Sequence, residues 1–292
     1  MPNFYLMQQT YKKSGVDIEA GEEVVRRIKK TVKTTFSKNV LADIGFFGAM
    51  YDASFPSYKH PVLVSSVDGV GTKLKIAFAM KRYNTVGQDL VNHCVNDIAV
   101  CGAAPLYFMD YFATGKLSST ITENVINGFA KACKENSCSL IGGETAEMPG
   151  FYKTGEFDIA GMIVGVVEKK NIINGKSITK GDILIGLPST GLHTNGYSLA
   201  RAVLQKIPLT KKLSSQQTLS DTLLAVHRSY LKPIQELHKK NLVKGISHIT
   251  GGGIIGNTMR VLPKGLTISL DWEAWERPEI FSFIQKTGNR HE

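Results

Sequence analysis

The sequence of 292 residues contains only four cysteines, and no two of them form a Cys-x-x-Cys pair. No cluster of histidines completes a zinc-binding spacing either, so the sequence predicts no structural zinc site. Cys94, Cys101 and Cys133 occupy apolar positions of helix-like segments. Thiols of this kind are usually buried and reduced, as in proteins of the reducing cytoplasm.

Long apolar runs are also missing. No run approaches the roughly 20 residues that a membrane-spanning helix needs. Residues 1–13 do not combine a basic start with an apolar stretch, which is the pattern of a secretion signal. Internal repeats and low-complexity tracts are absent as well. We therefore expect a cytoplasmic protein without a membrane partner.

Charge is unbalanced, with 35 Lys and Arg residues against 25 Asp and Glu residues and a net charge of +10. Such an excess serves a small anionic substrate, a nucleic acid, a membrane surface, or solubility alone. No long Lys/Arg block interleaved with aromatic residues is present, so we expect no nucleic-acid partner. The hydrophobic fraction of 42% and the charged fraction of 21% are typical of a soluble globular protein.

The usual glycine-rich nucleotide motifs are incomplete. The stretch 174–177 reads Asn-Gly-Lys-Ser, but Lys170 stands where the first glycine of a Walker A loop belongs. Residues 251–256 fit Gly-x-Gly-x-x-Gly, and Asp271 follows at a dinucleotide-binding distance, yet too little sequence remains for such a domain. A nest of backbone N–H groups for phosphate stays possible there. An ATP site in this chain must instead use acids and metal ions from several loops.

Hydrophobic periodicity predicts alternating strands and helices, and therefore an α/β or α+β fold. Residues 171–180 are polar and turn-like, so we place a boundary there between an N-terminal domain, 1–170, and a C-terminal domain, 171–292. The expected helices are 22–36, 74–80, 86–101, 122–135, 197–204, 223–239, a short one after 253, and 279–286. The expected strands are 61–67, 106–113, 139–141, 157–167, 182–187, 245–249 and 266–270.

The most informative loop follows the first expected strand and reads Asp68-Gly69-Val70-Gly71-Thr72-Lys73. Glycines let backbone N–H groups approach an anion closely. The carboxylate of Asp68 repels phosphate unless a divalent cation lies between them. The loop therefore predicts a metal–nucleotide site.

A second cluster lies on the expected helix 86–101, where Asp89, His93 and Asp97 are four residues apart and share one face. Two carboxylates around a histidine suit Mg²⁺, and Asp97 is the strongest candidate. The alternative is a polar face in water. The stretch 142–150, after the expected strand 139–141, adds Glu144 as a further metal ligand; its alternative is an ordinary glycine-rich turn.

Two polar loops complete the candidates. In the loop 189–198, His193 is an acid–base candidate, and the following helix start favours an anion. Thr194 or Asn195 is alternatively a plain N-cap. The second loop, 247–256, contains His248 followed by Thr250 and three glycines.

Together, these segments resemble the phosphoribosylformylglycinamidine cyclo-ligase family, also called aminoimidazole ribonucleotide synthetases, of purine biosynthesis. The match runs from Tyr11 to Asn289. It rests on the number and order of the motifs at 14–21, 68–73, 94–97, 110–116, 143–150, 189–198 and 247–256.

The resemblance implies an ATP-dependent ring closure of formylglycinamidine ribonucleotide, with Mg²⁺ on the triphosphate. It also implies a homodimer, with an N-terminal α/β domain forming a barrel at the dimer interface and a C-terminal α/β sandwich domain. We assign catalysis to His193, Asn195 and Lys73, and we expect Lys73 to contact phosphate as well. Metal binding is assigned to Asp68, Asp97 and Glu144. Nucleotide binding is assigned to Asp68, Gly69, Gly71, Thr72, Asp97 and Gly143, and substrate binding to His248, Thr250, Gly251, Gly252 and Gly253.

The chain departs from the family at the loop 45–48, which has fewer glycines, and at Gly256, where a glutamate is usual. It also stops before a family segment, so we expect a C-terminal domain without its last elements. Two alternatives remain: a sister ATP enzyme of the same superfamily, or an inactive dimer that only binds nucleotide. A selenophosphate synthetase is disfavoured because residues 1–38 contain no cysteine.

Overall fold

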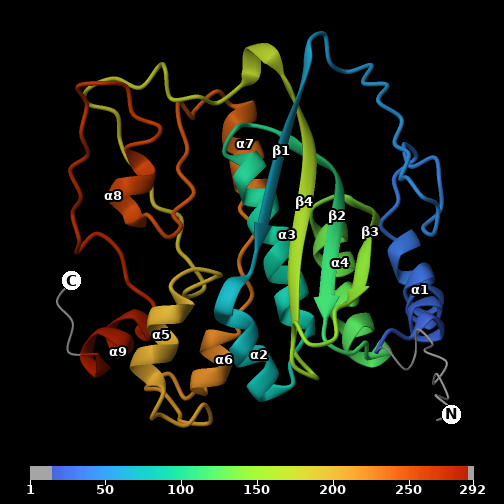
Figure 1. Cartoon of the computed structure of the whole chain (residues 1–292). Helices are drawn as coiled ribbons and strands as arrows, with labels where there is room; N and C mark the ends of the chain where they lie inside the picture. Colours follow the sequence, from blue (N-terminus) through green and yellow to red (C-terminus); the bar gives the residue numbers. More distant parts are fainter. Residues whose placement is uncertain (1–14, 289–292) are drawn as a thin grey trace, which may run out of the picture.

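The computed structural model describes residues 15–288. Residues 11–14 and 289, at the two ends of the family resemblance, lie outside this range. Figure 1 shows a sheet covered by helices in the N-terminal half, and beside it a C-terminal half of short helices joined by long loops. Within the described residues, no helix combines the length and apolarity needed to cross a bilayer.

The sheet has four strands in the order β1-β4-β2-β3. Strands β2 and β3 are parallel, whereas β4 is antiparallel to both β1 and β2. The strands are β1 (Pro61–Gly69), β2 (Ala104–Thr114), β3 (Ser139–Glu147) and β4 (Phe157–Glu168). Strand β3 is longer than predicted, because hydrogen bonding to β2 continues through the glycines at 142 and 143. The stretch that we expected to be a loop therefore begins as a strand.

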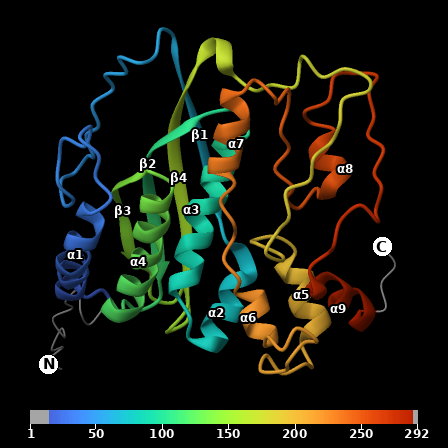
Figure 2. The same cartoon turned by 180° about the vertical axis from the view of Figure 1, so that it is seen from behind.

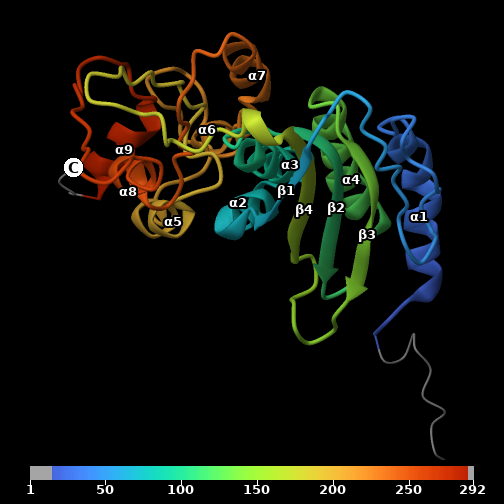
Figure 3. The same cartoon turned by 90° about the horizontal axis from the view of Figure 1, so that it is seen from above.

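Helices α3 (Asn84–Ala99) and α4 (Ser119–Glu135) cover one face of the sheet, as Figures 2 and 3 show. They cross closely at Gly87 and Gly128. A Cβ atom at Gly87 would lie 2.2 Å from the Val125 carbonyl oxygen, so only glycine permits this approach. The core between the helices and the sheet is apolar and includes Phe108, Phe112, Phe129, Leu90, Ile98 and Ile163.

Helix α1 (Ile18–Lys33) begins four residues before its predicted start, because Asp17 caps it. The Asp17 carboxylate accepts a hydrogen bond from the Ala20 N–H at 3.3 Å, which satisfies one of the free donors of the first turn. The short helix α2 (Leu74–Met80) forms as predicted, directly after a 3₁₀ turn at Gly71–Lys73.

The C-terminal half contains α5 (Tyr197–Leu204), α6 (Leu219–Leu223), α7 (Leu231–Lys239), α8 (Gly253–Thr258) and α9 (Glu279–Thr287). The predicted helix 223–239 is thus shortened to α7. Residues 224–230 form a connecting segment instead, because their backbone groups bond to side chains of α3, as described below.

The three strands predicted in the C-terminal half are not formed. The segments 182–187, 245–249 and 266–270 have no hydrogen-bonded strand partner within residues 15–288. A strand is stable only beside a neighbour, and Ile183 and Ile185 remain 87% and 77% exposed. The α/β class is confirmed, but the described part of the C-terminal half does not contain the predicted sandwich.

Candidate active site

The candidate site lies where helix α3 meets loops of the C-terminal half. Four polar residues of α3, Asp89, Asn92, His93 and Asn96, are at most 6% exposed, and Asp97 is partly exposed. The alternative of a polar face in water is therefore wrong for this helix. The polar face is instead the contact surface between the two halves of the chain.

Backbone groups of residues 225–230 bind to this face. The Asn92 side-chain amide donates to the His227 carbonyl oxygen at 2.7 Å, and the Asp89 carboxylate accepts from the His227 N–H at 2.7 Å. The Asn96 side-chain oxygen accepts from the Tyr230 N–H at 2.8 Å. These bonds satisfy buried backbone groups that a helix would otherwise have paired.

Lys73 and Asp89 form a fully buried ion pair at 2.7 Å, with both side chains 0% exposed. The Lys73 ammonium also donates to the carbonyl oxygens of His193, at 3.0 Å, and Ala225, at 2.8 Å. Burial lowers the pKa of Lys73, and the Asp89 carboxylate opposes that shift. All three ammonium hydrogens thus have acceptors within the chain. The enclosed Lys73 ammonium does not face a phosphate site, contrary to our expectation.

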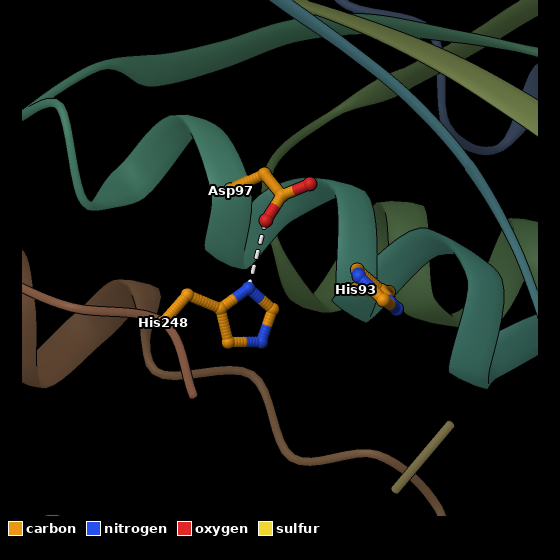
Figure 4. A group of neighbouring side chains, drawn as sticks. All are labelled: His93, Asp97 and His248. Atoms are coloured by element: carbon orange, nitrogen blue, oxygen red, sulfur yellow. Dashed lines mark hydrogen bonds and ion pairs between the residues drawn. The ribbon is translucent and has the colours of Figure 1, made fainter. Parts of the chain in front are cut away.

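Strand β1, helix α3 and the loop 247–256 bring two acid–histidine pairs together. Ser66 and Asp68 alternate along β1 on the side that faces α3. The His93 Nε2 lies 2.7 Å from the Asp68 carboxylate, and the His248 Nδ1 lies 2.7 Å from the Asp97 carboxylate (Figure 4). Ser66 donates to the other oxygen of Asp97 at 2.8 Å. Residues far apart in the sequence thus form one cluster.

Both carboxylates of these pairs are ionised near neutral pH. Burial alone raises the pKa of Asp68, but hydrogen bonding and the charge of His93 outweigh it and lower the pKa. Burial likewise opposes the ionisation of Asp97, whereas hydrogen bonds from His248 and Ser66 lower its pKa below the usual value. Two partly exposed carboxylates remain available for a cation.

Two further histidines, His193 and His227, lie beside this cluster, and the sequence analysis missed His227. His227 is 0% exposed and stacks on His193, with ring centroids 4.2 Å apart. His93 and His248 lie 5.2 and 5.5 Å from the His227 ring. His227 follows no glycine-rich motif, so only its distance from α3 in the folded chain marks it as part of the site.

His193 is held in an unusual conformation. Its φ angle of 55° lies in the left-handed region, which is uncommon for a residue with a side chain. Its Nε2 accepts a hydrogen bond from the Thr190 N–H at 3.0 Å. Burial, followed by the nearby positive charge of Lys73, lowers the pKa of His193 to about 4. His193 is therefore neutral at pH 7.

We expect the protein to lose stability as the pH falls from about 7 to about 5. Burial and the neighbouring histidines lower the pKa of His227 well below its usual value, as burial does for His193. In the unfolded chain, these histidines bind protons from about pH 6.5 downward, whereas in the folded protein they stay neutral to lower pH. Acid therefore favours the unfolded state, and the free energy of unfolding falls by about 1–2 kcal/mol per histidine. Denaturant titrations at both pH values measure the loss. His193→Gln should reduce it, whereas His60→Gln, at an exposed position, should leave it unchanged.

Most of the other predicted site residues lie in segments next to this cluster, whereas Gly143 and Glu144 lie away from it. The loop of Thr72 adjoins helix α5, because the Thr72 hydroxyl lies 3.1 Å from that of Ser198. The Asn195 side-chain oxygen lies beside Gly251, so the loop of His193 meets that of His248. Asp68 and Gly69 end β1, and Gly71 begins the 3₁₀ turn that follows. This turn thus reaches the loop 189–198, which in turn meets the loop 247–256. Thr250, Gly252 and Gly253 surround Asn257, which holds the start of α8.

Gly143 and Glu144 are not part of this cluster within one chain. In the register of the sheet, Asp68 of β1 lies opposite Gly161 of β4, Gly161 lies opposite Asp110 of β2, and Asp110 lies opposite Gly143 of β3. Three strand spacings of about 4.8 Å place Gly143 roughly 14 Å from Asp68. The structure therefore does not join Glu144 to Asp68 and Asp97 in one metal shell, because β3 lies at the opposite edge of the sheet.

Comparisons with known proteins agree on the family. Residues 52–167 match the N-terminal domain of AIR synthase related proteins, and residues 179–292 match their C-terminal domain. A phosphoribosylformylglycinamidine cyclo-ligase of Trichlorobacter lovleyi is 51% identical over 96% of this chain and 81% of its own length. Another, of Thermodesulfovibrio yellowstonii, is 50% identical over 98% of this chain and 84% of its own length.

Among solved structures, a thiamine-monophosphate kinase of Stenotrophomonas maltophilia is similar in fold. The TM-score is 0.52 at 18% sequence identity, over 74% of this chain and 64% of that chain. That identity supports the fold alone, whereas the cyclo-ligases share about half of their residues with this chain along almost all of its length. The chain belongs to the AIR synthase family and, within it, to the phosphoribosylformylglycinamidine cyclo-ligases.

Proposed function

We propose that this protein closes the imidazole ring of aminoimidazole ribonucleotide from formylglycinamidine ribonucleotide, with ATP converted to ADP and phosphate. The observation that carries the proposal is the identity of about 50% with cyclo-ligases over 96% of the chain. A sister enzyme is less well supported, because the structural relative of another activity shares only 18% identity.

In this reaction, the γ-phosphoryl group of ATP is transferred to the amide oxygen of the substrate. An amidine nitrogen then attacks the same carbon, the C–O bond breaks, and phosphate leaves as the ring forms. Catalysis of phosphoryl transfer depends mainly on positioning and on neutralising charge. We assign the positioning of the reacting amide to His193 and Asn195, and contacts with the rest of the substrate to His248, Thr250 and the glycines 251–253.

Asp68 and Asp97 suit Mg²⁺. Their oxygens are the donor type that Mg²⁺ prefers, both carboxylates are partly exposed, and their pKa values are lowered. Bound Mg²⁺ would neutralise the triphosphate beside the backbone of Gly69, Gly71 and Thr72. Lys73 has a different role in this proposal, since its ammonium holds the backbone of the His193 loop.

We further propose a cytoplasmic homodimer with a domain boundary near residue 170. The sheet face opposite α3 and α4 carries exposed apolar side chains, including Leu63 at 61% and Val67 at 68%. An uncovered apolar sheet face of this kind is typical of a contact with another protein surface. A barrel formed by two such sheets would cover it. The four cysteines are free, in keeping with a reducing compartment.

A coupled assay of ADP release tests the function. We expect ADP to appear only when formylglycinamidine ribonucleotide is added with Mg²⁺ and ATP. Asp68→Asn and His193→Ala should both reduce the rate, and parent-like turnover of both variants would contradict the site assignment. ATP binding without substrate-dependent ADP release by the parent would support the alternative of an inactive nucleotide-binding dimer.

A further inference from the structure

The hydroxyl of Thr194 lies between two histidines of the site. It is 2.6 Å from the Nδ1 of His93 and 3.3 Å from the Nδ1 of His227. His93 belongs to α3 (Figure 4), whereas His227 belongs to the segment that packs on this helix. The N-cap of α5 is Gly196 rather than Thr194. The Thr194 hydroxyl therefore bonds to the histidines and does not cap the helix that follows it.

The direction of these hydrogen bonds follows from Asn96. Its side-chain oxygen accepts from the Tyr230 N–H at 2.8 Å, so the other end of the amide is the NH₂ group. This group donates to the Arg228 carbonyl oxygen at 2.9 Å and lies 3.1 Å from the His227 Nε2. An amide NH₂ group only donates, so this Nε2 must accept. The network thus assigns the ring proton of His227 to Nδ1, which donates to Thr194.

On its other side, the Thr194 hydroxyl adapts to His93. A hydroxyl donates or accepts according to where its hydrogen points. It therefore donates to the His93 Nδ1 when this nitrogen carries no proton, and it accepts when the nitrogen is protonated. In both states His93 keeps an Nε2–H group that donates to the Asp68 carboxylate, 2.7 Å away. One hydroxyl thus holds the ring of His93 in the orientation that serves Asp68.

We propose that Thr194 is a positioning residue, which connects Asp68 to the loop of His193. This inference rests on the proposed function. Through His93, Thr194 orients the partner of a carboxylate assigned to the Mg²⁺–nucleotide complex. Through its own backbone, Thr194 fixes His193, the residue directly before it, which is assigned to the reacting amide. The phosphoryl donor and the acceptor amide are therefore aligned by groups that share one side chain.

The packing around His193 shows why the hydroxyl matters. The His193 ring stacks on His227, with centroids 4.2 Å apart, and the Lys73 ammonium holds the His193 carbonyl oxygen at 3.0 Å. Both His227 and His93 are buried, at 0% and 4% exposed. Removing the Thr194 hydroxyl would leave a ring nitrogen of each without its partner. Both rings would then turn toward other partners, and His193 would lose its fixed stacking surface.

Thr194→Val tests the proposal, because valine has the shape of threonine but no hydroxyl. We expect turnover in the ADP assay, at saturating substrates, to fall about 10- to 100-fold, as small misplacements of reacting groups do. The affinity for Mg²⁺ and ATP, titrated without the ribonucleotide, should fall about 10-fold. Thr194→Ser restores the hydroxyl and should return both values to nearly those of the parent. Thr120→Val, at an exposed position of α4, is the matched control and should change neither.

Parent-like turnover and nucleotide affinity of Thr194→Val would overturn the proposal, and so would an equal loss in Thr194→Ser. Circular dichroism verifies folding, and Thr194→Ala, which also lacks the hydroxyl, replaces the valine variant if that variant does not fold.

Nitrogen NMR of the histidine side chains, without nucleotide or substrate, tests the hydrogen bonds independently of activity. We expect His227 to carry its proton on Nδ1, and the Nδ1 signals of His93 and His227 to shift in Thr194→Val but not in Thr120→Val. A proton on the His227 Nε2, or unchanged signals in Thr194→Val, would overturn the proposal. If the parent releases no ADP, the cyclisation is rejected, whereas the NMR spectra and the nucleotide titration still decide the role of Thr194.

Discussion

Replacing Asp89 with asparagine is expected to lower the free energy of unfolding by about 3–5 kcal/mol. Asparagine keeps the shape of the side chain but removes the charge that neutralises Lys73. The Lys73 ammonium is 0% exposed, so its charge would stay buried without a counter-ion. Lys73→Met should be similarly damaging, because it leaves the Asp89 carboxylate unpaired. Guanidinium denaturation curves measure both losses.

A neighbouring exposed ion pair provides a matched control. Lys75 and Glu156 are also close, at 2.8 Å, but their side chains are 43% and 29% exposed. Lys75→Met should therefore cost only about 0–1 kcal/mol. The double variant Lys73→Met with Asp89→Leu should lose less than the sum of the single changes, since no charge remains buried. A loss in Asp89→Asn no larger than that in Lys75→Met would contradict the buried-charge explanation.

Replacing Asp97 with asparagine is expected to reduce the rate of substrate-dependent ADP release by about 100-fold or more, with little change in fold. Removing a group that stabilises developing charge in a transition state typically costs about 10²- to 10³-fold. Asp97 is partly exposed and accepts hydrogen bonds from His248 and Ser66, so asparagine fits the same space. The coupled ADP assay at saturating substrate measures the effect.

Two comparisons make the Asp97 result specific. Ser66→Ala removes only a hydrogen bond to the carboxylate and should cost about 10-fold. Asp43→Asn changes a surface carboxylate that pairs with Lys29 and Lys33, and it should leave the rate unchanged. Parent-like activity of Asp97→Asn would remove Asp97 from the proposed metal and nucleotide site.

Local patterns predicted most elements of the N-terminal half. The apolar run 62–64 predicted β1, and the apolar stripe of Leu90, Cys94 and Ile98 predicted α3. These signals are reliable because a short apolar run and a helical apolar stripe are both local properties of the chain. The same reasoning failed for the segment 182–187, whose apolar residues were interpreted as a strand. A strand depends on a partner that its own sequence does not specify.

The spacing of Asp89, His93 and Asp97 correctly predicted that they share one helix face. It did not reveal their different roles. Asp89 is paired with Lys73 in the interior, whereas Asp97 faces the cluster with His248. The difference arises from the partner of each turn of α3: Lys73 comes from the turn before α2, whereas His248 comes from a loop of the C-terminal half. Contacts between positions more than 100 residues apart leave no periodic signal in a single sequence.

By itself, the sequence determined the family, the α/β class, the N-terminal strands and the motifs that carry Asp68, His193 and His248. Motif order and side-chain period are local properties of the chain. Only the tertiary structure decided that Lys73 is an enclosed partner of Asp89, that His227 belongs to the site, and that Glu144 lies across the sheet from Asp68. Burial, strand register and the contact of the two halves fix these outcomes, and each depends on residues distant in sequence.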